Sequence, residues 1–347
     1  MPLPLHDFLQ QAQTLPVIDV RSPGEFAHAH IPGAVNMPLF DNAERAQIGT
    51  TYKQVGKDAA VLQGLDMVGP KMARFVRKAQ ALNPAGKQVL VHCWRGGMRS
   101  GSMAWLFNTA GLQADTLTGG YKAYRTDVLT SFAEPRNLLI LGGKTGSGKT
   151  DILKQLAAQG EQVIDLEGLA HHKGSSYGAI GQLPQPSSEH FENLIYEQWR
   201  QLDPTRRIWL EDESKNIGRC HIALPLWQQM RTAPVAFIDV PRPVRVQRLV
   251  QEYTGIDHEL LVEATKRIER RLGGLAAKQS LAALEQQDYA TVAELTLVYY
   301  DKAYLNGLTN RHAELVNHLP ISEDNPAKTA ADLIVWADAY AEKGVLR

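Results

Sequence analysis

Short apolar runs alternate with stretches of helical spacing along almost the whole chain. The runs are rich in β-branched residues and typical of buried strands; they cover 16–20, 87–93, 137–143, 161–167, 206–212 and 234–240. Between them, stretches such as 101–110 and 150–159 place apolar residues at the spacing of a helix face. Strands that alternate with helices predict an α/β fold built on parallel sheets.

A polar segment at 130–137, which contains Pro135, interrupts this alternation. The length of 347 residues suits two domains, possibly with a further region. We therefore predict one domain over 1–133 and an α/β domain over 134–255. From 256 to 347 the pattern is mostly helical and is broken at Gly273-Gly274. This region is expected to be helical and to be part of the second domain or to pack on it.

Composition excludes several classes of protein. An apolar content of 44% and a charged content of 21% are those of an ordinary globular chain. We expect no membrane helix because no long apolar run is present, and no signal peptide because the N-terminus lacks a basic segment before an apolar one. Two cysteines cannot form a disulfide framework, so we expect a cytoplasmic protein. We also predict a monomer. The zero net charge leaves a nucleic-acid partner open.

The strand predicted at 87–93 ends at Cys93 and enters a loop rich in glycine and arginine. Backbone N–H groups of such a loop, and the helix N-terminus after it, lower the pKa of a thiol and favour an anion. The sequence thus predicts a thiolate nucleophile with an anion-binding loop, whose members are Arg95, Gly96, Gly97, Arg99 and Ser100. The alternative is a buried structural cysteine at a strand end.

The first 130 residues resemble a rhodanese domain. The resemblance rests on 17–38 (with Asp19, Arg21 and Glu25), on the Cys93 loop, and on the closing segment 117–125. It implies a parallel sheet with helices on both faces and transfer of sulfur or selenium through the cysteine. Rhodanese loops usually bring their arginine one residue earlier. Here His92-Cys93, five residues and Arg99-Ser100 show the spacing of cysteine-dependent phosphatases, so the loop should accommodate a phosphate-bearing substrate. A phosphatase is the alternative, and it needs a general acid.

A second glycine-rich loop follows the strand predicted at 137–143 and opens a helix, which is the context of a phosphate-binding P-loop. Lys149 is expected to pair with the terminal phosphate and Thr150 to ligate Mg²⁺. The predicted diphosphate-binding residues are Gly143, Lys144, Thr145, Gly146, Ser147, Gly148, Lys149 and Thr150.

Acidic residues follow two of the other predicted strands, beside this loop. Asp165 follows one strand, and Glu211, Asp212 and Glu213 follow another. Such acids can hold a metal directly or through water. If Leu210 is buried, alternation puts Glu211 and Glu213 on one face, so the metal candidates are Asp165, Glu211 and Glu213. The alternative is a solvated acidic turn.

Three further segments are candidates for substrate or RNA contact. His171, His172, Lys173 and Ser175 lie in a polar loop that suits a phosphate or RNA. Arg242, Arg245 and Arg248 recur every third residue on one helical face and resemble the arginine-bearing region of small P-loop kinases. Lys266, Arg267, Arg270, Arg271 and Lys278 lie at spacings that place several on one helix face, where they could neutralise RNA phosphates. For both helices the alternative is a solvated face, balanced in the second by Glu263 and Glu269.

The chain resembles the tRNA 2-selenouridine synthase family over nearly its whole length. The resemblance rests on both loops and on the segments 165–176 and 209–218. That resemblance implies an N-terminal rhodanese-like domain, a C-terminal P-loop NTPase-like α/β domain, and conversion of wobble 2-thiouridine to 2-selenouridine in lysine, glutamate and glutamine tRNAs. The substrates would be geranyl diphosphate, which alkylates the sulfur, and selenophosphate, with an enzyme that supplies selenophosphate as a further partner. Cys93 would carry the selenium, and the P-loop would bind the diphosphate.

Two other interpretations remain open. A small-molecule P-loop kinase fused to a sulfurtransferase would turn over ATP without RNA. A nucleotide-binding regulator with a rhodanese-like interaction module would tolerate replacement of Cys93.

Overall fold

The computed structural model describes residues 1–309 and 311–342, and the chain divides into two compact units, Met1–Ser131 and Phe132–Arg347. Within the described residues, no helix combines the length and the apolar character needed to cross a bilayer.

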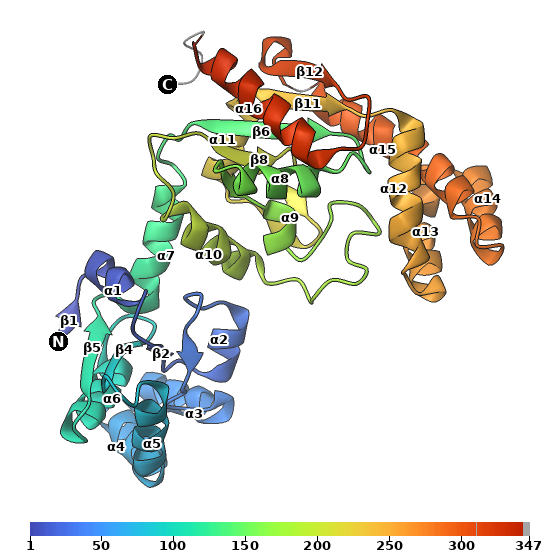
Figure 1. Ribbon diagram of the computed structural model, residues 1–347. Coiled ribbons are helices and arrows are strands. Elements are labelled where there is room, and N and C mark those ends of the chain that lie inside the picture. The colour runs from blue at the N-terminus through green and yellow to red at the C-terminus, as the bar shows by residue number, and fades with distance from the viewer. Residues whose placement is uncertain (310, 343–347) are drawn as a thin grey trace. The chain divides into compact units, whose positions relative to one another are not determined.

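Unit 1 is built on a five-stranded parallel sheet in the order β1-β5-β4-β2-β3 (Figure 1). Parallel strands need crossover connections, which the intervening helices supply. The elements are β1 (Pro2–Leu3), α1 (Leu5–Gln11), β2 (Val17–Asp19), α2 (Pro23–His28), β3 (Val35–Asn36), α3 (Asn42–Gln54), α4 (Lys57–Val68), a 3₁₀ turn (Gly69–Lys71), α5 (Met72–Leu82), β4 (Gln88–His92), α6 (Met98–Thr109), β5 (Gln113–Leu117) and α7 (Gly120–Ser131).

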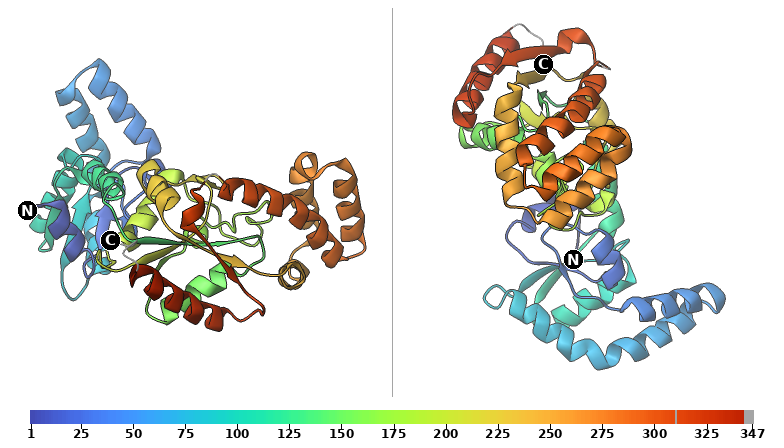
Figure 2. Two further views of the ribbon diagram at one scale, coloured as in Figure 1. Left: turned by 90° about the horizontal axis from the view of Figure 1, so that it is seen from above. Right: turned by 90° about the vertical axis from the view of Figure 1, so that its right-hand side faces the viewer.

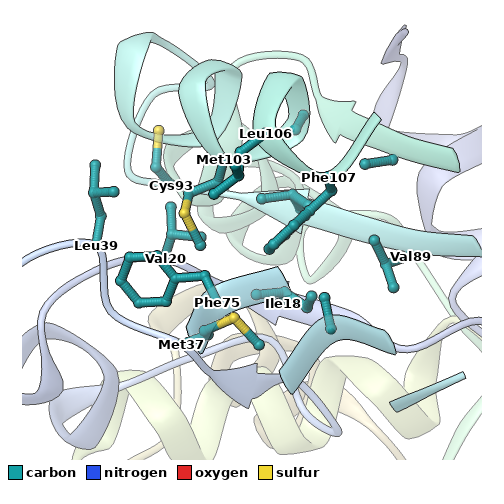
Figure 3. Close-up of a cluster of buried hydrophobic side chains, with 14 of the residues drawn as sticks. Ile18, Val20, Met37, Leu39, Phe75, Val89, Cys93, Met103, Leu106 and Phe107 are labelled. Atoms are coloured by element: carbon teal, nitrogen blue, oxygen red, sulfur yellow. The ribbon is translucent and has the colours of Figure 1, made fainter. Parts of the chain in front are cut away.

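The core of unit 1 lies where the central strands meet the helices. Alternate residues of β2 and β4 point into it, as the period of a strand requires. Figure 3 shows Cys93 at the margin of this cluster, with its sulfur turned away from Val20 and Phe75. The apolar core therefore fixes the backbone at Cys93 and leaves the sulfur facing the loop.

Unit 2 contains a second five-stranded parallel sheet in the order β12-β11-β6-β8-β7. Helix α16 packs beside α8, and α11 packs on β6. The elements are β6 (Leu138–Gly143), α8 (Lys149–Ala158), β7 (Gln162–Ile164), α9 (Leu166–Leu169), α10 (Ser188–Trp199), β8 (Ile208–Glu211), β9 (Asn216–Ile217), β10 (Cys220–His221), α11 (Leu224–Thr232), β11 (Val235–Asp239), α12 (Arg242–Thr254), α13 (His258–Leu272), α14 (Gly274–Glu285), α15 (Tyr289–Leu308), a 3₁₀ turn (Ala313–Leu315), β12 (Val316–Pro320) and α16 (Pro326–Glu342).

Helices α12 to α15 gather at one end of the second sheet, where they enclose their own apolar cluster (Figure 1; Figure 2). Gly273 separates α13 from α14 with a φ of 91°, a conformation that glycine adopts without steric cost. The helix break predicted at this position is confirmed.

The six strands predicted from apolar runs all form, and both large sheets are parallel, which confirms the α/β class. The prediction of a helical region from residue 256 is incomplete, because β12 pairs with β11 along the sheet edge. Its residues are partly exposed and include Asn317 and His318, so it lacks the apolar run of a central strand.

Candidate active site

Cys93 lies between the end of β4 and the start of α6, and is the first residue of the predicted anion-binding loop. Its side chain is 3% exposed, and its Sγ lies 3.2 Å from the Ser100 Oγ. Burial alone would raise the pKa of Cys93. Hydrogen bonds from the Ser100 hydroxyl and from the N–H groups of Ser100, Arg95 and Gly97 outweigh burial, so the pKa lies below that of an ordinary thiol. The loop therefore favours a thiolate, which is the nucleophilic form of cysteine.

The closing segment predicted at 117–125 packs directly on this loop. The backbone N–H of Tyr121 donates to the Cys93 carbonyl oxygen at 2.8 Å, and that of Lys122 donates to the Trp94 carbonyl oxygen at 2.9 Å. Gly120 has a φ of 59°, and a Cβ there would lie 2.4 Å from the Cys93 carbonyl oxygen. Only glycine allows this approach, so the start of α7 fixes the loop that carries the thiol.

Two arginines of the loop have different surroundings. The Arg99 Nη1 donates to the Glu25 Oε2 at 2.9 Å, and Glu25 also accepts the Ser22 N–H in the capping box of α2. Arg95 is exposed and makes no ion pair with any described residue. The carboxylate of Glu25 thus orients Arg99, a role that the sequence analysis did not assign to it.

A buried ion pair stabilises the strand ends of unit 1. Arg21 and Asp19 are at most 1% exposed, and the Arg21 Nη2 lies 2.6 Å from the Asp19 Oδ2. His92 is fully buried beside them, and burial lowers its pKa to about 4. His92 is therefore neutral near pH 7, and we assign this group to the scaffold of the loop.

The P-loop joins β6 to α8, with Gly148 as the N-cap of the helix. The Lys149 Nζ donates to the Gly143 carbonyl oxygen at 3.0 Å, so the lysine folds back over its own loop. The Gly143 N–H donates to the Tyr304 hydroxyl at 3.0 Å, and that hydroxyl donates to Asp212 at 2.8 Å. The N-terminus of α8 and the ammonium of Lys149 therefore provide hydrogen-bond donors and positive charge at the same loop, an arrangement suited to a phosphate.

Other side chains in and around the P-loop are either buried or held in ion pairs. Lys144 pairs with Asp239 at 3.1 Å, and Ser147 is buried. The guanidinium of Arg248 lies against Gly148, and Arg248 also pairs with Asp151 and Asp324.

The acid that ends β8, Glu211, and the two that follow it alternate in direction, as strand alternation predicts. Leu210 and Glu211 are 0% exposed, which excludes a solvated turn for Glu211. Its Oε2 accepts the Leu166 N–H at 2.9 Å, and burial together with Asp165 raises its pKa well above that of an ordinary carboxyl. Asp212 turns the other way, to Tyr304 and Arg311.

Glu213 is half-buried beside Glu167, an acid that the sequence analysis did not select. Loss of solvent and the Glu167 carboxylate raise the pKa of Glu213, although the Lys149 ammonium opposes the shift. The shift favours the uncharged form of Glu213, which repels an anion at the P-loop less than a carboxylate would.

Two side chains beside the P-loop, Thr150 and Glu167, are suited to hold Mg²⁺. The Thr150 Oγ1 lies 3.5 Å from the Glu167 Oε2, which provides a hydroxyl and a carboxylate side by side. In 1–309 and 311–342, no three His, Cys, Asp or Glu side chains gather as a metal-binding group. Mg²⁺ is commonly held by one or two protein ligands with phosphate oxygens and water, so these residues fit that mode. Asp165 caps α9 by accepting the Gly168 N–H at 2.7 Å.

The polar loop at 171–178 reaches the same acids. Gly174 has a φ of 67°, and a Cβ there would lie 2.5 Å from the Glu167 Oε1. His171 is held by the Pro184 carbonyl oxygen at 2.9 Å, and Lys173 pairs with Glu252 at 3.4 Å. The hydroxyl of Ser175 accepts the Tyr177 N–H at 3.2 Å. Burial and Arg267 lower the pKa of His172, which is therefore neutral near pH 7.

The prediction for the arginines of α12 needs a correction. Arg245 is 2% exposed, makes two 2.8 Å bonds to Asp301, and donates to the Thr145 carbonyl oxygen at 3.2 Å. A side chain buried in this way cannot contact RNA. Arg245 instead stabilises the P-loop through its hydrogen bond to the Thr145 carbonyl oxygen. Arg242 pairs with Glu294 near the surface.

Exposed cations cluster on two helices. All members of each cluster are exposed, and none of them forms an ion pair within the described parts of the chain. We call them the α13 basic face (Lys266, Arg267, Arg270 and Arg271) and the α5 basic face (Arg74, Arg77 and Lys78). Lys278, on α14, is also exposed. Arg267 lies close enough to His172 to affect its pKa, so the α13 basic face adjoins the loop at 171–178.

Comparisons with known proteins match both units. Residues 136–323 match the family described as tRNA 2-selenouridine synthase AAA domain, and residues 4–127 match the rhodanese-like domain. The tRNA 2-selenouridine synthase of Bordetella petrii is 37% identical over 328 residues, which cover 84% of this chain and 86% of that protein. The chain belongs to the tRNA 2-selenouridine synthase family. The synthase of Bdellovibrio bacteriovorus is 35% identical over 353 residues, covering 88% of this chain and 92% of the relative.

Membership of this family confirms the predicted fold class, with a rhodanese-like domain before a P-loop domain.

Proposed function

We propose that this protein converts 2-thiouridine at the wobble position of lysine, glutamate and glutamine tRNAs to 2-selenouridine. The substrates are geranyl diphosphate and selenophosphate. The observation that carries the proposal is that one chain holds two glycine-rich strand-to-helix loops, one with a cysteine whose pKa is lowered and one with a lysine folded over its own loop. The sulfur of a thiocarbonyl is a poor leaving group, so a first step that alkylates it makes the second step possible.

The P-loop is suited to the first step. The sulfur of 2-thiouridine attacks C1 of the geranyl group, the C1–O bond breaks, diphosphate leaves, and the proton on N3 is released. Negative charge develops on the departing diphosphate, where the N-terminus of α8 and Lys149 stabilise it. Among the described residues, Lys149 is bonded only to a backbone oxygen of its own loop, so it can move to the phosphate. When bound, Mg²⁺ would neutralise further diphosphate charge, held by Thr150 and Glu167.

The Cys93 loop is suited to the second step, in which selenium displaces the alkylated sulfur. A selenium nucleophile forms the C2–Se bond, the C2–S bond breaks, and geranylthiolate leaves. Selenophosphate carries a tetrahedral phosphoryl group, and inward N–H groups together with Arg99 fit such an anion. We assign the selenium donor to this loop and the geranyl donor to the P-loop.

The α13 basic face is our proposed contact for tRNA phosphates. Its four cations are exposed and free of carboxylate partners among the described residues, so they are available to replace the counterions of RNA. It also adjoins the loop that reaches the acids beside the P-loop.

The test is mass spectrometry of nucleosides from 2-thiouridine tRNA incubated with the protein. One arm contains geranyl diphosphate alone, and a second adds selenophosphate. We expect Lys149→Ala to lose geranylation, and Cys93→Ala to keep geranylation but lose selenation. Lys154→Ala is the matched control, since it removes an exposed lysine (68% exposed side chain) from the same helix.

Unchanged nucleosides in every arm with the wild-type protein would refute the proposal. ATP turnover without any effect of tRNA would then favour the kinase interpretation. Loss of both steps in both variants would show that the two loops do not serve separate reactions.

A further inference from the structure

The Cys93 loop has the spacing of a phosphoryl-transfer loop, a feature that the transfer of selenium alone does not explain. Five residues separate Cys93 from Arg99, and Ser100 follows. In the folded protein, the Ser100 Oγ lies 3.2 Å from the Cys93 Sγ, and the Glu25 Oε2 accepts the Arg99 Nη1 at 2.9 Å. Hydrogen bonding by the N–H groups of the loop contributes to the lowered pKa of the thiol. The loop therefore surrounds the thiol with hydrogen-bond donors and carries an arginine fixed by Glu25, a combination suited to a tetrahedral anion at the thiolate.

We propose that the Cys93 Sγ attacks the phosphorus of selenophosphate, and that the protein passes through an S-phosphocysteine. This inference rests on the proposed function, since it takes selenophosphate as the substrate of the loop. The S–P bond forms as the P–Se bond breaks, and the bonding pair leaves on selenium as HSe⁻. The phosphoryl group, and not the selenium, is then carried by Cys93, which differs from the role that the family resemblance implies.

Electron balance favours phosphorus over selenium as the point of attack. If the thiolate attacked selenium, the P–Se bonding pair would leave on phosphorus and reduce it to the level of phosphite. Release of phosphate with a selenium-bearing cysteine would instead need an oxidant, and neither substrate supplies one. Attack at phosphorus changes no oxidation state. HSe⁻ can then attack C2 of the geranylated base, and its proton ends on N3 of the product.

The charges around the loop fit a leaving group that needs no acid. Burial works against the shift, but the Arg21 guanidinium bonded to Asp19 holds the pKa of that carboxyl low, and Arg99 does the same for Glu25. Both carboxyl groups are therefore ionised near pH 7 and have no proton to give. An alkoxide leaving group would need that proton, whereas hydrogen selenide is a strong enough acid to leave as its anion. The loop is thus better suited to a P–Se bond than to a phosphate ester.

Ser100 is expected to act in the second half of this reaction. Water attacks phosphorus, the S–P bond breaks, phosphate leaves, and Cys93 is restored as the leaving group. The Ser100 Oγ lies 3.2 Å from the Sγ, where its hydroxyl can stabilise the departing thiolate. Removing that hydroxyl should slow breakdown of the adduct more than its formation, so the phosphocysteine should accumulate.

The experiment is intact-protein and peptide mass spectrometry after rapid mixing with selenophosphate, with and without S-geranylated tRNA. We expect a phosphoryl adduct on the Cys93 peptide of Ser100→Ala, at higher occupancy than in the wild-type protein. With the wild-type protein at steady turnover and without tRNA, phosphate and hydrogen selenide should be released in equal amounts. Cys93→Ser should lose both the adduct and P–Se cleavage. Cys220→Ser, which removes the other cysteine, should behave like the wild-type protein.

Selenium has a distinctive isotope pattern, so the two adducts can be told apart. An adduct on Cys93 that carries selenium and no phosphorus would overturn this inference. So would formation of 2-selenouridine by Ser100→Ala with no phosphoryl adduct on Cys93 in either arm. In both cases the nucleoside would still form, and the proposed function would stand. Absence of 2-selenouridine with the wild-type protein would instead refute the proposed function itself.

Discussion

Replacing Gly120 by alanine tests how the first loop is fixed. Gly120 has a φ of 59°, and an added Cβ would lie 2.4 Å from both the Cys93 carbonyl oxygen and the Gly96 nitrogen. Both contacts are to backbone atoms, so no side chain can turn aside to relieve them. The substitution must therefore move the start of α7 away from the loop.

The expected cost follows from two contributions. A non-glycine residue in the left-handed region costs about 1–2 kcal/mol. The two hydrogen bonds from α7 to the loop, Tyr121 to Cys93 at 2.8 Å and Lys122 to Trp94 at 2.9 Å, contribute about 0.5–1.5 kcal/mol each. Loss of both, with the backbone strain, lowers the free energy of unfolding of unit 1 by about 2–5 kcal/mol.

The assay is chemical unfolding of the full-length protein, combined with the two nucleoside reactions. Gly101→Ala is the matched control, because a Cβ at this α6 position meets no atom within 4 Å. It should stabilise unit 1 by about 0.5–1 kcal/mol, the usual gain of alanine over glycine in a helix. Gly120→Ala should reduce selenation and leave geranylation unchanged. Wild-type stability and selenation in Gly120→Ala would refute this account of the loop.

Three further predictions concern other parts of the molecule. Arg245→Met should destabilise unit 2 by about 1.5–3 kcal/mol in chemical unfolding, because Asp301 loses a charged partner; no change would contradict a supporting role. The rate of Cys93 alkylation should reach half its maximum at a pH below the ordinary thiol value, since its pKa is lowered, whereas Cys220, with its pKa raised by burial to about 11, should stay unmodified; equal pH profiles in peptide mass spectrometry would refute this. Replacing three cations of the α13 basic face by alanine should reduce the slope of log affinity for tRNA against log salt by about 2–3, and the same change on the α5 basic face should not; an equal effect of both would exclude a localised contact.

The elements that carry the two loops could be predicted from the sequence because their signals are local. The run at 137–143 and the glycines after it predict a strand, a loop and a helix, and β6 and α8 form there. Burial of Leu210 was enough to place Glu211 on the side of Asp165 and Asp212 on the other side. The edge strand β12 escaped prediction, since it is partly exposed and has no continuous apolar run.

The interactions that adjust each loop could not be predicted, because they join residues far apart in the chain. The pair of Glu25 and Arg99 spans 74 positions, and the bond from the Gly143 N–H to Tyr304 spans 161. No spacing rule connects such positions. The prediction for Arg245 was wrong for the same reason. Helical spacing indicated an exposed side chain, but Arg245 is buried and bonded to Asp301, an acid far away in the chain.

The two loops share the same local structure and differ in the group to which their cationic side chain is bonded. In each, a strand leads into glycines whose N–H groups and following helix favour an anion. Lys149 is bonded to a carbonyl oxygen of its own loop, so it can pair with a phosphate without first breaking an ion pair. Arg99 is fixed by a carboxylate whose own position is set by a helix cap. The first arrangement suits a charge that moves away with a departing diphosphate. The second suits a phosphoryl group that must stay in line with a nucleophile.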